Sequence, residues 1–244
     1  MKCILTSYLD LYEKDENDNK ISKNFGNQNH ILDNIKKYTK KYDNFLFVAS
    51  NAYNNDETDT YANITFESFE KTLPFKDYKI LDSRTEDITD ELVKNADLIF
   101  LCGGHVPTQN EFFNKINLKE KIKNSDALII GGSAGAMNMA DTVYCPPELD
   151  GEAINPNFKK IYKGLSLTNI NIFPHYDEIK DNLVDGIHVI NEIVIPDSYQ
   201  YDIYAINNGS YILIDGENYL YGEAYLIKNG KIGKINDDDK VVTI

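Results

Sequence analysis

The sequence predicts an α/β fold: an open, mostly parallel sheet flanked by helices. Short runs that are apolar throughout recur over the first half of the chain, as expected for strands buried on both faces of a parallel sheet. Segments with helical spacing separate them, which predicts right-handed strand–helix–strand crossovers. The apolar runs are CILTS (3–7), NFLFVAS (44–50), YKILD (78–82), ADLIFLCGG (96–104) and DALIIGG (126–132). The predicted helices span 27–42, 62–73, 85–96 and 108–124.

The second half of the chain has a different texture. Residues 142–164 contain three prolines and are predicted to be loop, whereas 165–176 and 192–197 are predicted to contain strands. Three turn dipeptides divide residues 202–235 into short strands, as in β-hairpins: Asn208-Gly209, Asp215-Gly216 and Asn229-Gly230. We interpret this part as the far side of the same sheet followed by a C-terminal β-hairpin or meander. Residues 1–244 are therefore expected to form one domain.

Charge and cysteine content narrow the class of protein. The net charge is −14, which argues against nucleic acid and anionic membranes as partners. No apolar run approaches the roughly 20 residues of a membrane helix, and the acidic Asp10 comes too early for a signal peptide. The three cysteines form no CxxC pair, so a reducing cytoplasm is the expected setting.

The most informative stretch is GGSAG (131–135), which fits G-x-S-x-G at the end of a predicted strand. A nucleophilic serine on a sharp strand-to-helix turn needs small neighbours, because bulky ones would collide with adjacent strands. The amide of Ala134 at the helix start can then face a developing oxyanion. A second glycine pair, in LCGGH (101–105), predicts Gly104 as another such donor. Either pair is also compatible with a tight turn that has no catalytic role.

A serine nucleophile needs a base, and the chain has four histidines. His30 falls in a predicted helix, His188 alternates with apolar residues, and His105 adjoins the predicted oxyanion donors. His175, in IFPHYD, follows a proline at a strand end and is the favoured base.

These motifs resemble peptidase family S51, the dipeptidase E-like serine peptidases, which have a class I glutamine amidotransferase-like fold. The stretches FLCGGHVPTQNEF, IIGGSAGAMNMAD, GLSLTNINIFPHYD and YAINNGSYILI occur in the family's order. The resemblance covers nearly the whole chain, from Ile4 to about Ile232. It implies Ser133 as nucleophile, His175 as base, and Gly104 and Ala134 as oxyanion hole. It also implies a short peptide or related amide as substrate, and no cofactor.

The sequence departs from the family pattern in two ways. The residue before Gly209-Ser210, where the family carries Glu or Asp, is Asn208, which can orient an imidazole but brings no charge. Asp177 and Asp202 are candidates to replace the missing acid. Between His175 and Asn208 there is also no arginine that could hold an aspartate of the substrate.

Two other interpretations of the protein's function remain open. The chain could be an amidotransferase-like binding or regulatory domain with little catalysis, a reading that Asn208 favours. It could also be an α/β-hydrolase esterase in which Asp150 precedes His175 in chain order. Metal-ligand spacings and a G-x-G-x-x-G nucleotide fingerprint are absent from the sequence. A homodimer is one assembly that the sequence leaves open.

Overall fold

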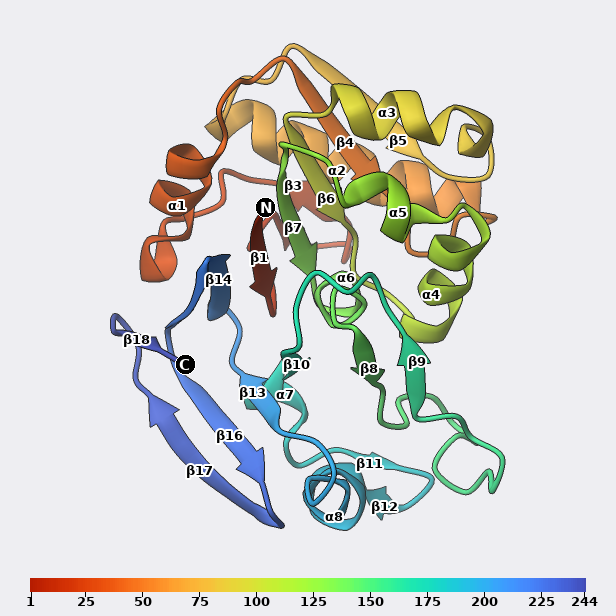
Figure 1. Ribbon diagram of the computed structural model, residues 1–244, viewed down its shortest axis with the longest axis vertical. Coiled ribbons are helices and arrows are strands. Elements are labelled where there is room, and N and C mark those ends of the chain that lie inside the picture. Colours follow the sequence, from red (N-terminus) through yellow and green to blue (C-terminus); the bar gives the residue numbers. More distant parts are fainter.

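The computed structural model describes all residues, 1–244, and is built around an eight-stranded sheet (Figure 1). Five strands are parallel, as predicted, and three antiparallel strands extend the sheet beyond β1. The strand order is β18-β15-β14-β1-β7-β6-β4-β5. The parallel strands are β1 (Lys2–Thr6), β4 (Asn44–Val48), β5 (Asp77–Leu81), β6 (Leu98–Leu101) and β7 (Leu128–Gly132). The others are β14 (Tyr211–Asp215), β15 (Glu217–Tyr221) and β18 (Val241–Thr243).

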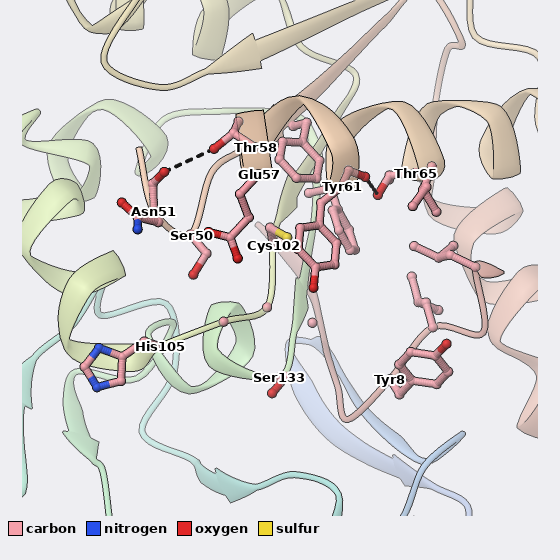
Figure 2. A pocket seen from close by; sticks show the side chains of 18 of the residues that line it. Tyr8, Ser50, Asn51, Glu57, Thr58, Tyr61, Thr65, Cys102, His105 and Ser133 are labelled. Atoms are coloured by element: carbon pink, nitrogen blue, oxygen red, sulfur yellow. Dashed lines mark hydrogen bonds between the residues drawn. The ribbon is translucent and has the colours of Figure 1, made fainter. Parts of the chain in front are cut away.

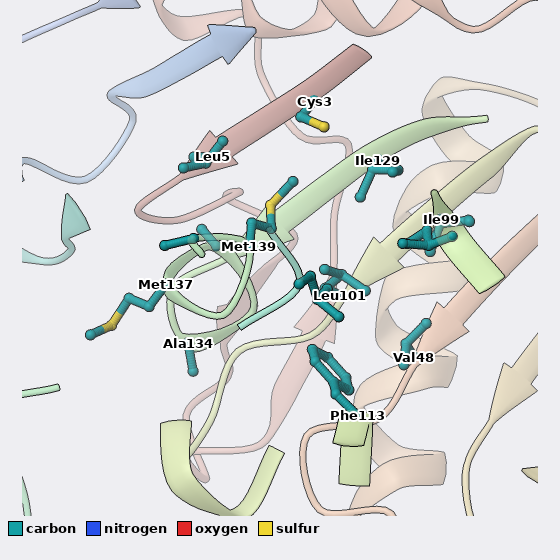
Figure 3. Packing of buried hydrophobic residues seen from close by; sticks show 14 of the residues in the cluster. Cys3, Leu5, Val48, Ile99, Leu101, Phe113, Ile129, Ala134, Met137 and Met139 are labelled. Carbon is teal, nitrogen blue, oxygen red and sulfur yellow. The ribbon is translucent and has the colours of Figure 1, made fainter. Parts of the chain in front are cut away.

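The central strands are apolar throughout because both of their faces are buried. In β1, Cys3 and Leu5 point into one core cluster, while Ile4 points into the cluster on the opposite face. Figure 3 shows the first cluster, in which Leu5 and Ile129 from neighbouring strands lie close to side chains of the segment after β7. This alternation explains why the strands read as continuous apolar runs in the sequence.

Helices cover both faces of the sheet. The first cluster includes side chains of α3, α4, α5 and α6, and the second includes side chains of α1 and α2. The helical elements of this half are η1 (Gln28–His30), α1 (Ile31–Tyr38), α2 (Asn55–Thr72), η2 (Glu86–Ile88), α3 (Thr89–Asn95), α4 (Val106–Lys115), α5 (Leu118–Ile122) and α6 (Ala134–Met137). None of the helices in the chain is both long enough and apolar enough to cross a bilayer.

A second sheet, of four strands, lies below the first in Figure 1. Its core contains Phe173, Ile203 and Ile227. The strands are, in spatial order, β10 (Asn171–Phe173), β13 (Ile203–Ile206), β16 (Ala224–Lys228) and β17 (Lys231–Asn236). Three two-stranded ribbons complete the β-structure: β2 (Tyr12–Lys14) with β3 (Lys20–Ser22), β8 (Thr142–Tyr144) with β9 (Ile161–Lys163), and β11 (Leu183–Val184) with β12 (Ile187–His188).

The C-terminal half differs from the sequence prediction in three ways. The predicted loop 142–164 contains the β8–β9 ribbon. The prediction of a strand at 192–197 is wrong, because the chain there forms the π-helical turn η3 (Val189–Val194) and α8 (Ile195–Asp197). The short helix α7 (Tyr176–Ile179) precedes them. A short apolar run fits a buried helix as well as a strand. The C-terminal strands also do not form one continuous meander, since they alternate between the two sheets.

The turn at Asn208-Gly209 has a special place in this arrangement. The other two turn dipeptides close the predicted hairpins, β14–β15 and β16–β17. Strands β13 and β14, on either side of Asn208, do not pair with each other: β13 pairs with β10 and β16, and β14 with β1 and β15. The predicted hairpin at Asn208 is instead the point where the chain crosses from the small sheet to the large one.

Candidate active site

Ser133 lies on a sharp turn between β7 and α6. Its backbone has φ 47° and ψ −114°, a conformation that residues other than glycine rarely adopt. The Ser133 amide is held by the Thr6 carbonyl at 2.9 Å, which ties the turn to the end of β1. A strained, half-buried serine of this kind, at the carboxyl end of a parallel strand, has the geometry of a nucleophile elbow.

The glycines beside Ser133 are needed for close packing. A Cβ on Gly131 would lie 2.6 Å from the Cα of Ala136, and a Cβ on Gly135 would overlap the Leu101 carbonyl group. Contacts this short leave no space for even a methyl group against backbone. The small residues of GGSAG therefore allow α6 to fold back against β7 and β6.

Two backbone amides are available beside Ser133. Gly104 has φ +146°, and its N–H donates to no other backbone group. A Cβ there would lie 2.7 Å from the Cβ of Ser50, so only glycine fits. Ala134 is the first residue of α6, where helix N–H groups lack partners within the helix. Gly104 and Ala134 line the same small cavity as Ser133, where they could donate to an oxyanion.

His175 and Asn208 are in direct contact. The Nδ1 atom of His175 lies 2.8 Å from Oδ1 of Asn208. The His175 backbone is in the left-handed region, with φ 57°, between β10 and α7. The Ser133 hydroxyl makes no hydrogen bond to the imidazole, although both side chains line the same two cavities. Such bonds are often long without substrate and shorten when it binds.

Three further residues hold this pair. The buried Ser7, at the end of β1, accepts from the His175 amide at 2.7 Å and donates to Oδ1 of Asn208 at 3.0 Å. Glu178 accepts from Nδ2 of Asn208 at 2.7 Å, and Asp177 accepts from the Asn208 backbone amide at 3.0 Å. The sequence suggested Asp177 but gave no signal for Ser7 or Glu178.

The other acidic candidates lie elsewhere. Asp202 pairs with Lys228 at 2.5 Å on the exposed side of the small sheet. Asp150 is exposed in a turn. In an esterase triad its carboxylate would bond to Nδ1 of His175, but that atom is bonded to Asn208. The structure therefore does not support the esterase pairing. Neither Asp177 nor Asp202 forms a hydrogen bond or an ion pair with the His175 ring.

The remaining histidines have other partners. The His105 ring bonds to Thr108 at 2.8 Å and approaches Glu152 at 3.4 Å, while lining the larger cavity. His30 is exposed beside Asp33, and His188 caps η3. His, Cys, Asp and Glu side chains nowhere gather in threes that could hold a metal ion.

Ser133 stands where two cavities meet. The larger, of about 500 Å³, has a wall of α2 side chains that includes Glu57 and Tyr61, opposite Ser133 (Figure 2). The smaller, of about 260 Å³, is lined mainly by apolar side chains. These are Val106, Met137, Cys145, Pro146, Pro147, Phe173, Pro174, Ile179, Val184 and Val189, with Ala134 beside the elbow.

The cavity walls carry carboxylates and no Lys or Arg side chain. Glu57 lines the larger cavity, and Glu148 lines both. The Glu148 side chain is open to the cavity, yet loss of water on its protein side raises its pKa, an effect that His105 partly offsets. The only arginine, Arg84, is bonded to Asp59 and Asp82. This environment disfavours an acidic group in the larger cavity.

The cysteines are not reactive thiolates at neutral pH. All three are free and buried, and burial raises the pKa of each thiol to about 12. Cys145, which lines the smaller cavity, is therefore a thiol and not a reactive thiolate at neutral pH.

Comparison with known proteins agrees with this description. A family model matches residues 20–221, most of the chain, and it is a model of peptidases. The chain belongs to peptidase family S51. No curated protein matches it.

Two solved structures have the same fold. One is a peptidase from an acI-B1 Actinobacterium, with a TM-score of 0.68 and 14% identity over 100% of this chain and 96% of the other. The second, from Listeria monocytogenes EGD-e, is assigned as a peptidase E; its TM-score is 0.57 at 17% identity, over 96% of this chain and 98% of the other. The mostly parallel sheet flanked by helices is thus the architecture of these peptidases.

Proposed function

We propose that this protein is a serine peptidase that cleaves short peptides or related amides. The observation that carries the proposal is the strained Ser133 turn, which faces the same cavities as a His175 ring oriented by Asn208. If GGSAG only formed a tight turn, nothing would require its serine to be strained and to share a cavity with an oriented imidazole. The family membership supports the same chemistry.

The proposed reaction is acyl transfer to water. Oγ of Ser133 attacks the scissile carbonyl while Nε2 of His175 takes the hydroxyl proton. The amides of Gly104 and Ala134 stabilise the oxyanion. His175 then gives the proton to the leaving amine, which departs. A water molecule, deprotonated by the same nitrogen, hydrolyses the acyl-enzyme and restores Ser133.

The cavities favour small substrates on either side of Ser133. One side mixes polar side chains with three tyrosines, Tyr8, Tyr12 and Tyr61, and the other is mainly apolar. Since no Lys or Arg side chain lines the larger cavity, we expect little preference for an aspartate there, unlike the aspartyl dipeptidases that the sequence resembles. The unpaired cysteines are consistent with a cytoplasmic site of action.

A small fluorophosphonate tests the proposal. We expect the wild-type protein to gain the mass of one phosphonyl group, located on Ser133 by peptide mapping, and Ser133→Ala and His175→Ala to gain none. Circular dichroism should show all three proteins folded. Wild-type protein would then be screened against dipeptides with neutral, basic and acidic first residues.

The second candidate is a binding or regulatory domain, which Asn208 favours because an amide cannot stabilise an imidazolium by charge. Folded wild-type protein that takes up no phosphonate would refute the peptidase and support this alternative.

A further inference from the structure

The Asn208 side chain bridges an imidazole and a carboxylate. Its Oδ1 lies 2.8 Å from Nδ1 of His175, and its Nδ2 donates to Oε1 of Glu178 at 2.7 Å. Glu178 lies in the first turn of α7, three residues after His175. The histidine and the carboxylate therefore come from one short segment, and the amide from the crossing between the sheets completes the link.

Glu178 determines which way the amide points. An ionised carboxylate only accepts hydrogen bonds, so the nitrogen end of Asn208 has to face it. In the reverse orientation, two oxygen acceptors would meet at this distance. The Ser7 hydroxyl adds to the preference, because it accepts from the His175 amide and has its proton free for Oδ1 of Asn208.

The direction of the amide in turn determines the state of the ring. With Oδ1 facing it, Nδ1 of His175 has to carry the proton, so Nε2 of the neutral ring is unprotonated and able to accept one. The geometry points to Glu178 as a positioning residue that, through Asn208, holds His175 in the tautomer a general base requires. The inference deepens the proposed peptidase function and rests on it.

Glu178 acts here through hydrogen-bond direction more than through charge. Its side chain is exposed, so water screens its field at the imidazole. Asp177, the other carboxylate beside Asn208, accepts from the backbone amide and cannot select a side-chain orientation. Glu178→Gln is the sharpest change, because glutamine can present either oxygen or nitrogen and so removes the constraint at nearly constant shape.

Ring nitrogen chemical shifts measure the tautomer without any need for activity. In ¹⁵N-labelled wild type we expect the neutral His175 ring to be protonated at Nδ1, and in Glu178→Gln we expect a mixture of tautomers. A wild-type ring protonated at Nε2, or a tautomer ratio that Glu178→Gln leaves unchanged, would overturn the inference.

The rate of phosphonylation at Ser133 gives a second readout through a double-mutant cycle. With Asn208 present, Glu178→Gln should slow labelling in proportion to the fraction of His175 rings that lose the proton at Nδ1, about twofold for equal populations of the two tautomers. With Asn208→Asp, Glu178 would face a second carboxylate, whereas a glutamine in its place could donate a hydrogen bond to that carboxylate. Glu178→Gln should then leave the rate unchanged or raise it. Equal losses in both backgrounds would refute the link through Asn208.

Asp202→Asn is the matched control, since it removes another exposed carboxylate that bonds only to Lys228. We expect its labelling rate to equal that of the wild type. The two readouts also separate the two proposals: an unlabelled Ser133 with the expected tautomers would refute the peptidase alone, whereas normal labelling with unchanged tautomers would refute only the role of Glu178.

Discussion

Gly135→Ala tests the claim that the elbow packs directly on the neighbouring strand. The added Cβ would overlap the Leu101 carbonyl oxygen, and it would lie 2.7 Å from the Leu101 carbonyl carbon and 2.9 Å from the oxygen of Cys102. These atoms belong to the backbone at the end of β6 and cannot rotate away. We therefore expect a penalty near or above the upper end of the usual overpacking range, about 3 kcal/mol.

The helical preference of alanine offsets only about 1 kcal/mol of this penalty. The net loss of about 2 kcal/mol should lower the thermal midpoint by about 4–8 °C for a chain of this size. Circular dichroism melting and urea titration measure it. Gly132→Ala is the control, since its Cβ would meet the Phe100 ring at an ordinary 3.5 Å. A Gly135→Ala protein as stable as Gly132→Ala would refute the packing argument.

Three other substitutions test separate features. Ser133→Gly should be more stable than Ser133→Ala by about 1–2 kcal/mol in urea, because glycine relieves the strained φ; equal stabilities would contradict the strain. Glu148→Gln should melt higher than wild type at pH 7, because the raised pKa of Glu148 makes its ionised form unfavourable in the folded state. The gain should vanish as the pH falls below about 4, where the unfolded carboxyl is also protonated. Tyr211→Phe should lose about 1–3 kcal/mol, since the buried hydroxyl bonds to Asn34 and Asn29; an unchanged urea midpoint would show that these bonds contribute little.

The parallel part of the sheet could be predicted from the sequence because its signal is local. Each of the five apolar runs overlaps an observed parallel strand, and the helices between them lie where apolar spacing placed them. Two details differ: α2 begins seven residues earlier, at Asn55, and the helix predicted over 108–124 is divided into α4 and α5. Burial on both faces makes the central strands apolar at nearly every position, and the regular alternation of these runs with helical spacing distinguishes them from an isolated apolar run such as 192–197.

The C-terminal half could not be predicted to the same depth, because a turn dipeptide does not identify the partner of a strand. Asp215-Gly216 and Asn208-Gly209 look alike in the sequence, yet only the first closes a hairpin. The second sheet depends on long-range pairing, such as β10 with β13, that has no local signature.

The site follows the same division. The sharp turn at Ser133 could be located from its glycines, and the place of His175 after a strand from the apolar run before it; the catalytic roles of both residues stay predictions. Ser7 and Glu178 could not, because a serine at the end of β1 and a glutamate in a short acidic helix have ordinary surroundings in the sequence. Their importance comes only from contacts with residues 168 and 30 positions away, respectively.

The arrangement in two sheets has a consequence for the rate of the proposed reaction. Ser133 follows a strand of the large sheet, and His175 follows a strand of the small one. Only the Ser7 hydroxyl, at the end of β1, bonds to both His175 and Asn208. The distance between the proposed nucleophile and base therefore depends on the alignment of the two sheets, which share a buried core: Leu5 of the large sheet belongs to the same cluster as Ile172 and Ile206 of the small one. Substitutions along the junction of the sheets, remote from any substrate, would speed or slow the reaction by shifting that alignment.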